Sequence, residues 1–167
     1  MFKNLKPEML SNNFFKSIGT DWMLISAGEK DSFNMMTASW GGTGILWNKP
    51  VVQIFVRPQR YTHEFIEKCD YFTCSFFPPE YHHIHDICGS KSGRDIDKAA
   101  AAGLIPCFDG RSVWYEQADL VLICKKIYRD VIKGSCILDK KIDSSMYPEK
   151  DYHTAYIGEI AEILAAE

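Results

Sequence analysis

The chain has 167 residues, of which 46% are apolar, 25% charged and 13% aromatic, and its formal net charge at pH 7 is −3. These values fit one soluble domain over residues 1–167, long enough to bury a core without disulfides or a metal. They argue against sequence-independent binding to nucleic acid, because no surplus of cations is available to neutralise a phosphate backbone.

The cysteines and the N-terminus favour a cytoplasmic protein. The chain contains no C-x-x-C pair, and several of its six cysteines stand inside apolar runs. The first seven residues lack the apolar stretch of a secretory signal, and no run is long enough to span a membrane. We therefore expect free thiols in a reducing compartment and no membrane association.

Short apolar runs separated by turn residues dominate the first half of the chain. Residues 21–27 and 33–40 predict the two strands of a hairpin. Further β-branched and aromatic runs predict strands at residues 51–56 and 71–77. The glycine-rich residues 41–44 begin like a dinucleotide-binding fingerprint but lack its last glycine, so we interpret them as a flexible loop.

Helical patterns are few and short. Residues 61–68 place Tyr61 and Phe65 on one face and predict a helix. The alanine-rich residues 96–102 predict a second helix that ends at Gly103.

The second half contains further strand signals. Residues 120–124 predict a buried strand, residues 135–138 predict another, and Asp109-Gly110 is a hairpin signal. The C-terminal residues 155–163 fit a strand and a helix almost equally well. Many short strands without regular β-α-β alternation favour a mainly β fold, a barrel with helical decorations, over a Rossmann or flavodoxin-like fold.

One strand end could hold a flat ligand. Residues 34–40 place small polar side chains beside Trp40, where the backbone could approach the polar edge of a heterocycle. An ordinary edge strand explains the same pattern equally well.

Two basic clusters indicate an anionic ligand. Arg57, Arg60 and Thr62 stand at the start of the predicted helix 61–68, and helix N-termini attract phosphate. Residues 91–94 form the second cluster. Each cluster alone is typical of a solvated turn, but the two together in an acidic chain favour a phosphorylated ligand.

The sequence gives less support to a metal site or to catalysis by side chains. His82, His83 and His85 fall within four residues, yet His83 would leave the helical face that the other two share, so a surface helix turn is favoured over a metal site. His153 stands alone, with a structural role or a place near a substrate both open. No nucleophile motif is present, so redox work by a bound cofactor fits better than side-chain chemistry.

The ordered set of these segments resembles the flavin-reductase-like, FMN-binding split-barrel family. Each block is weak, but their order along residues 21–163 is that of the family. The blocks are residues 34–40 (NMMTASW), 57–62 (RPQRYT), 75–77 (SFF), 92–95 with Asp97-Lys98, 115–120 and 151–153.

The resemblance implies a six-stranded antiparallel Greek-key split barrel that forms a homodimer, with FMN near the interface. It makes the C-terminal segment a strand. Thr37, Ala38 and Ser39 would hold the edge of the isoalloxazine ring, with Trp40 packed nearby.

The resemblance also distributes the remaining contacts. The basic cluster after the third strand would contact phosphate or ribityl, Ser75 and Phe76 would line the pocket, and the second cluster would close over the phosphate. The implied cofactor-binding residues are Asn34, Met36, Thr37, Ala38, Ser39, Trp40, Arg57, Arg60, Tyr61, Thr62, Ser75, Phe76, Lys91, Ser92, Gly93 and Arg94.

The implied activity is that of an oxidoreductase that passes electrons from NAD(P)H through FMN to a flavin or protein acceptor. Trp40 and His153 are the candidates for the substrate side. One alternative is a flavoredoxin-type carrier reduced by a protein partner. Another is a non-catalytic module that binds a phosphorylated ligand, or a metal at residues 82–85.

Overall fold

The computed structural model describes all 167 residues. Ten strands account for most of the regular structure, and all pairs are antiparallel. The strands are β1 (Phe2–Asn4), β2 (Met23–Glu29), β3 (Ser32–Ala38), β4 (Gly41–Leu46), β5 (Lys49–Val56), β6 (Tyr71–Phe76), β7 (Pro106–Phe108), β8 (Val113–Tyr115), β9 (Leu120–Val131) and β10 (Thr154–Ala166).

The helices are short, and none is long and apolar enough to cross a bilayer. The α-helices are α1 (Phe14–Gly19), α2 (Tyr61–Lys68), α3 (Ile84–Ser90), α4 (Lys98–Ala101) and α5 (Lys140–Met146), and the 3₁₀ turns are η1 (Pro7–Met9), η2 (Pro79–Tyr81) and η3 (Gly134–Cys136).

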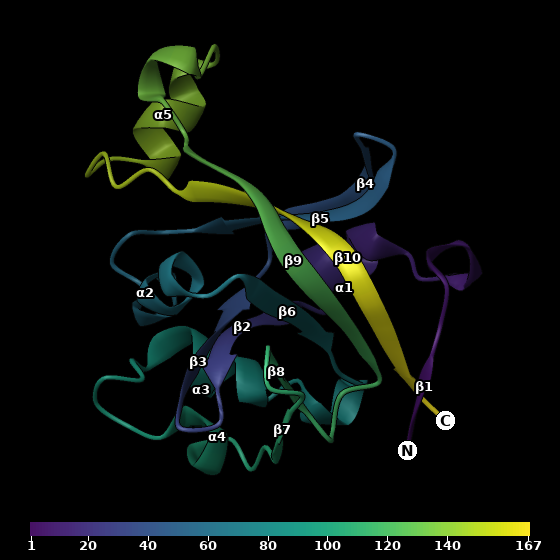
Figure 1. Cartoon of the computed structure of the whole chain (residues 1–167). Helices are drawn as coiled ribbons and strands as arrows, with labels where there is room; N and C mark the ends of the chain where they lie inside the picture. Colours follow the sequence, from purple (N-terminus) through teal and green to yellow (C-terminus); the bar gives the residue numbers. More distant parts are fainter.

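The main sheet contains eight strands in the order β3-β2-β6-β9-β10-β5-β4, with β1 added to β10, and β7 pairs with β8 beside it. Figure 1 shows β9 and β10 crossing the molecule as two long curved strands. The two ends of the sheet, β3 and β4, are joined by only Ser39 and Trp40. Such a short connection brings the sheet ends together, so the sheet curls into a split barrel.

Alternation along the strands divides the apolar side chains between the barrel interior and its outside. Eighteen buried residues fill the interior, among them Met36, Phe72 and Leu122. Met35, the neighbour of Met36 on β3, points to the other face and packs with residues of α3 and α4. A Cβ added at Gly158 would lie 2.6 Å from the Phe72 ring, so the tight packing of β10 on β6 requires glycine there.

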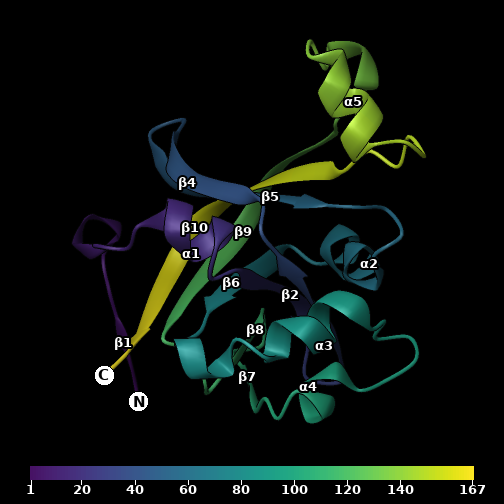
Figure 2. The ribbon, with the colours of Figure 1, turned by 180° about the vertical axis from the view of Figure 1, so that it is seen from behind.

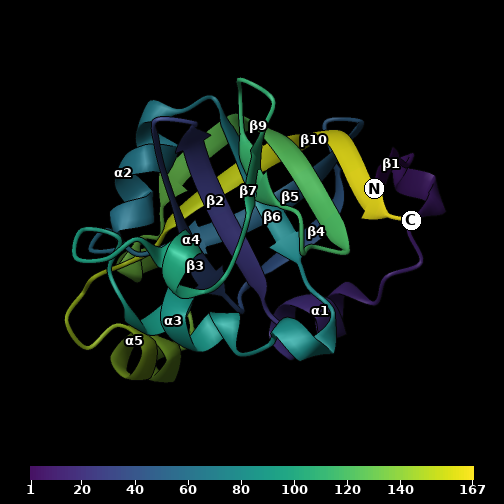
Figure 3. The ribbon, with the colours of Figure 1, turned by 90° about the horizontal axis from the view of Figure 1, so that it is seen from below.

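The helices cover different parts of the barrel. Seen from below, α3 and α4 lie beside β3 at one end of the sheet (Figure 3). From behind, α1 lies near β4, at the other end (Figure 2). Residues 132–153, which join β9 to β10 and contain α5, form the α5 segment. This segment and the β4–β5 hairpin project from the same end of the barrel (Figure 1).

The fold class predicted from sequence is confirmed, as are the four first-half strands and helix 61–68. The predicted strand count of six is too low, since the main sheet contains eight. The C-terminal segment is a strand, β10, which pairs on both sides with long neighbours.

Two local predictions were wrong. Residues 41–44 are not a loop but the start of β4, because the positive φ angles of Trp47 and Asn48 form a tight hairpin that pairs the glycines with β5. Residues 135–138 are not a strand. They begin within η3, and Leu138 is 92% exposed, so this apolar run has no sheet to join. The alanine helix is shorter than predicted, covering residues 98–101.

Candidate functional site

A groove runs along the outer end of β3, past the start of α2, to the loop after α3. It consists of two cavities of about 170 and 310 Å³ that share Met36, Arg57 and Arg60. The smaller cavity is also lined by Thr37, Ala38, Ser39, Trp40, Phe55 and His153. The larger is also lined by Asn34, Gln59, Tyr61, Thr62, Ser90, Lys91, Ser92, Gly93 and Lys98.

The wall of the groove is the free edge of β3. Lys98 Nζ donates to the carbonyl oxygen of Met35 at 2.6 Å, so this carbonyl faces away from β2. Alternate residues of an antiparallel strand share one edge, so the backbone N–H and C=O of Thr37 face the same way. A flat ligand beside β3 would therefore meet a backbone donor and an acceptor.

His85 fixes the side chain of Thr37. The Thr37 hydroxyl donates to the His85 carbonyl oxygen at 3.1 Å, and His85 Nδ1 lies 3.2 Å from the same hydroxyl oxygen. Because the hydroxyl proton is already used, Nδ1 must be the protonated nitrogen that donates to it. Burial, with His82 nearby, lowers the pKa of His85 to about 4, so the ring is neutral at pH 7.

Cations gather at the other end of the groove. Arg60 donates to the Gly89 carbonyl oxygen at 2.7 Å, which holds its guanidinium beside the loop that carries Lys91. Lys98 is 4% exposed and donates to the carbonyl oxygens of Met35 and Cys88. Burial lowers the pKa of Lys98 to about 8. Helix α2 begins here without a side-chain cap, so its first N–H groups are open to an anion.

Asn34, Thr62 and Gly93 pack tightly beneath this cationic end. Asn34 Nδ2 donates to Thr62 Oγ1 at 2.9 Å, which leaves the Thr62 hydroxyl proton free for a ligand. A Cβ added at Gly93 would overlap the carboxamide oxygen of Asn34 and lie 3.3 Å from the Tyr61 ring. Only glycine lets the loop after α3 close so near to Asn34.

Trp40 and His153 form the opposite end. Their ring centroids are 5.0 Å apart, and the His153 Nδ1 atom bonds to the Tyr147 hydroxyl at 2.9 Å. Burial, helped by Arg57, lowers the pKa of His153 to about 4. His153 is therefore neutral at pH 7 and serves as a wall and hydrogen-bonding group.

Arg57 is bound within the protein. Its guanidinium pairs with Asp151, donates to the Met146 carbonyl oxygen at 2.8 Å and lies 5.2 Å from the centre of the Tyr147 ring. Gln59 also donates to Asp151, at 2.7 Å. Arg57 thus fastens the α5 segment to the groove, and its two terminal nitrogens already have partners.

The structure brings together most of the residues singled out in the sequence. Three of them do not line the groove: Ser75, Phe76 and Arg94. Those that do are Asn34, Met36, Thr37, Ala38, Ser39, Trp40, Arg57, Arg60, Tyr61, Thr62, Lys91, Ser92, Gly93 and His153.

The positions of these three residues outside the groove have physical explanations. Ser75 and Phe76 belong to β6, which lies inside the sheet between β2 and β9, whereas the groove follows an outer edge. Ser75 is fully buried, and Phe76 packs against Phe14 with ring centroids 5.8 Å apart. Arg94 pairs with Glu64 and lies 4.5 Å from the centre of the Tyr61 ring, just outside the groove.

Four groove residues were missed: Phe55, Gln59, Ser90 and Lys98. Lys98 stood within a segment quoted for the family resemblance, so that signal was available, whereas no local pattern marks Phe55. The predicted surface turn of histidines is corrected in part, because His85 is 3% exposed. His82 lies near His85, with ring centroids 5.5 Å apart, and no three metal-ligating side chains converge.

The chain is similar in sequence and fold to known flavin-binding proteins. A family model described as the flavin reductase like domain matches residues 15–166, and a search of curated protein sequences finds no match. Flavoredoxin of Desulfovibrio vulgaris (Miyazaki F) is 23% identical, with a TM-score of 0.68, over 98% of this chain and 78% of that one.

Two further solved structures share the fold. An FMN-binding protein from Thermus thermophilus, with bound p-hydroxybenzaldehyde, is 17% identical, with a TM-score of 0.70, over 99% of this chain and 82% of that one. An NADH:FAD oxidoreductase from Streptomyces globisporus is 14% identical, with a TM-score of 0.64, over 88% of this chain and 76% of that one.

Proposed function

This chain belongs to the flavin reductase-like domain family, and on that premise we propose that it is an oxidoreductase that works through FMN bound in the groove. One observation supports this most: the groove has an end where cations gather and an end walled by the rings of Trp40 and His153, joined by a free strand edge. A phosphorylated flat heterocycle has the same polarity along its length.

Different residues of the groove would bind different parts of FMN. Arg60, Lys91, Lys98 and the start of α2 would hold the phosphate, and the Thr62 hydroxyl would donate to a phosphate or ribityl oxygen. Arg57 would contribute indirectly, because it holds the α5 segment in place.

The β3 edge from Thr37 to Ser39 would bind the polar edge of the ring by its backbone. When bound, FMN supplies the group that accepts hydride from NAD(P)H and passes electrons to a flavin or protein acceptor. Trp40 and His153 would exclude water from that end and shape the space for the electron donor. His153 is uncharged there at pH 7, because burial and Arg57 lower its pKa to about 4.

A second candidate is an electron carrier reduced by a protein. The flavoredoxin of Desulfovibrio vulgaris supports it through the shared fold. Reduction by NADH or NADPH in stopped flow, seen as loss of flavin absorbance, distinguishes the two. Fast bleaching supports the reductase, whereas slow bleaching beside fast reduction by a reduced ferredoxin supports the carrier.

We also propose a homodimer and a cytoplasmic location. Large apolar side chains are exposed on the hairpin and on the α5 segment, including Ile45, Trp47 and Leu138, which a second copy would cover. Both features project from the same end of the barrel (Figure 1, Figure 2). All six cysteines are free, as a reducing compartment would keep them.

The direct test is the absorption spectrum of the purified protein, with chromatographic identification of any released flavin. FMN in near-equal ratio to protein supports the proposal, and failure to bind added FMN rejects it. Replacing Arg60 and Thr62 together by Ala should weaken FMN binding roughly tenfold to a hundredfold, because phosphate loses charged hydrogen bonds. Arg94→Ala, outside the groove, is the matched control and should leave the affinity unchanged.

A further inference from the structure

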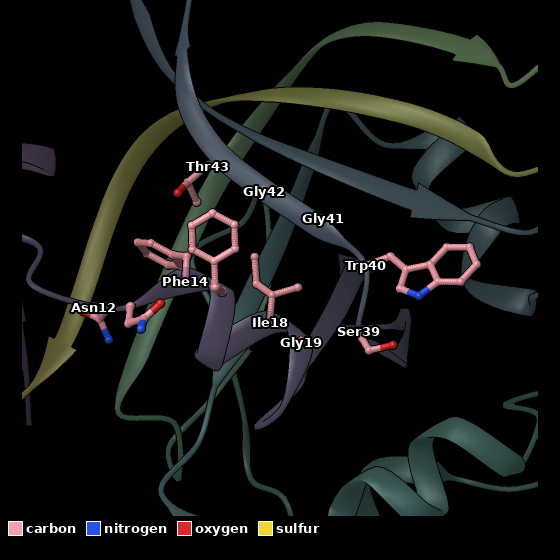
Figure 4. Close-up of a pocket in the computed structure, with 11 residues that line it drawn as sticks. Asn12, Phe14, Ile18, Gly19, Ser39, Trp40, Gly41, Gly42 and Thr43 are labelled. Atoms are coloured by element: carbon pink, nitrogen blue, oxygen red, sulfur yellow. The ribbon is translucent and has the colours of Figure 1, made fainter. Parts of the chain in front are cut away.

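A further cavity lies beside the groove, between α1 and β4. Its volume is about 630 Å³, and Ser39 and Trp40 line both it and the groove. Figure 4 shows Phe14 and Ile18 of α1 below Gly41, Gly42 and Thr43 of β4, while the Trp40 ring points away from this space. The cavity is thus a separate space that meets the groove at the connection between the sheet ends.

Backbone conformation and packing require glycine at some of the glycine positions of β4 but not at all of them. Gly41 has a φ of +156°, and a Cβ there would lie 2.7 Å from the Gln53 carbonyl oxygen, so glycine is required. Gly42 has neither constraint, because its φ is ordinary and an added Cβ would meet no atom within 4 Å. Gly41 and Thr43 pair with core residues of β5, whereas Gly42 pairs with Gln53, which is exposed. Because side chains alternate along a strand, Thr43 faces α1 and the cavity, and a side chain at position 42 would lie on the opposite face of β4.

The lining has a consistent chemistry. None of its eleven residues carries a charge, in contrast to the cationic end of the groove. Phe14 and Ile18 provide an apolar floor, and Phe15 is 95% exposed at the rim. The Asn12 amide, the Ser39 and Thr43 hydroxyls and the unpaired outer edge of β4 supply hydrogen-bonding groups around that floor.

We propose that the α1–β4 cavity binds a second ligand, an uncharged flat aromatic molecule with carbonyl or hydroxyl groups at its edge. The phenyl rings and the bare peptide planes at Gly41-Gly42 give it flat apolar surfaces. The volume is within the usual range for small-molecule sites.

The matched pair Thr43→Phe and Gly42→Phe tests this assignment. Thr43 is exposed on β4, and Gly42 has an ordinary φ and open space at Cβ, so both variants are expected to fold. Only the side chain at position 43 lies on the face of β4 that lines the cavity. Coumarin, an uncharged flat lactone, is titrated by calorimetry into the FMN-free and FMN-saturated protein. We expect Thr43→Phe to weaken coumarin binding at least tenfold and Gly42→Phe to change it less than twofold.

Three further measurements complete the test. Coumarin-3-carboxylate should bind the FMN-saturated protein at least tenfold more weakly than coumarin, because no cation lines the cavity. FMN affinity, measured on the same variants, should not change. Unchanged coumarin binding in Thr43→Phe overturns the inference, and so does light scattering that shows both phenylalanine variants to have lost a dimer. If no variant binds FMN but coumarin discriminates as expected, only the FMN proposal fails.

Discussion

Acid should destabilise this protein through two buried histidines. His85 and His153 are 3% and 8% exposed, and burial lowers both pKa values from 6.5 to about 4. Between pH 6.5 and 4 the unfolded chain binds a proton at each histidine that the folded chain does not. Stability from these groups is therefore complete above pH 6.5 and is lost as pH falls towards 4.

The magnitude follows from the size of the shift. A displacement of about 2.5 units corresponds to about 3.4 kcal/mol for each histidine once the pH is below both values. At pH 5.5 the loss is about 1.4 kcal/mol each, or about 3 kcal/mol together, a large part of the stability of an ordinary domain. His85 and His153 share no hydrogen-bond partner, so the two effects should add.

Urea unfolding of the FMN-free protein at pH 7.5, 6.5 and 5.5, followed by tryptophan fluorescence, measures this effect without a contribution from ligand binding. The variants His85→Asn and His153→Asn each lower stability at pH 7.5, since each removes packing. Each should also lose about 1.4 kcal/mol of the decline between pH 7.5 and 5.5. If both variants keep the full decline of the parent, the histidines are not the source of acid sensitivity and the reasoning is refuted.

Three other substitutions test packing and charge. Gly93→Ala should weaken FMN binding at least tenfold in a fluorescence titration, because the new methyl displaces Asn34; an unchanged affinity would contradict the close approach. Gly158→Ala should lower the free energy of unfolding by about 1–3 kcal/mol in urea, since its Cβ would meet the Phe72 ring. Lys98→Met should weaken FMN binding at pH 7. The parent's affinity, but not the variant's, should fall as pH rises through about 8 and the ammonium loses its proton.

Local sequence patterns correctly predicted the elements that depend on interactions within one segment. Helix α2 has its apolar face and the Glu64–Lys68 spacing within eight residues, and it appears with the predicted bounds. The prediction of a loop at residues 41–44 was wrong for the opposite reason. Their strand depends on a hairpin turn at Trp47 and Asn48 and on pairing with β5. Glycine propensity cannot reveal a partner that lies elsewhere in the chain.

The site shows the same division. Residues 34–40 and 57–62 are short contiguous runs at element ends, and the fold brings both runs to the groove. In the sequence, Ser75 and Phe76 also stand in a short run at the end of a predicted strand. That strand, however, lies in the middle of the sheet. Lys98 becomes part of the groove only because α4 packs under β3, where its side chain reaches the Met35 carbonyl. The order of the strands in the sheet determines which of these residues line the groove. That order cannot be read from any single segment of the sequence.

The two free edges of the sheet explain why ligand sites gather where they do. A barrel closed by strand pairing would offer side chains alone, but β3 and β4 each keep one unpaired backbone edge. Helices α3 and α4 lie beside the β3 edge and contact it through His85 of α3 and Lys98 of α4, and the groove lies next to these contacts. Helix α1 lies beside β4, and the space between them is the cavity. Ser39 and Trp40 join the two edges, so a ligand at either edge contacts the same connection.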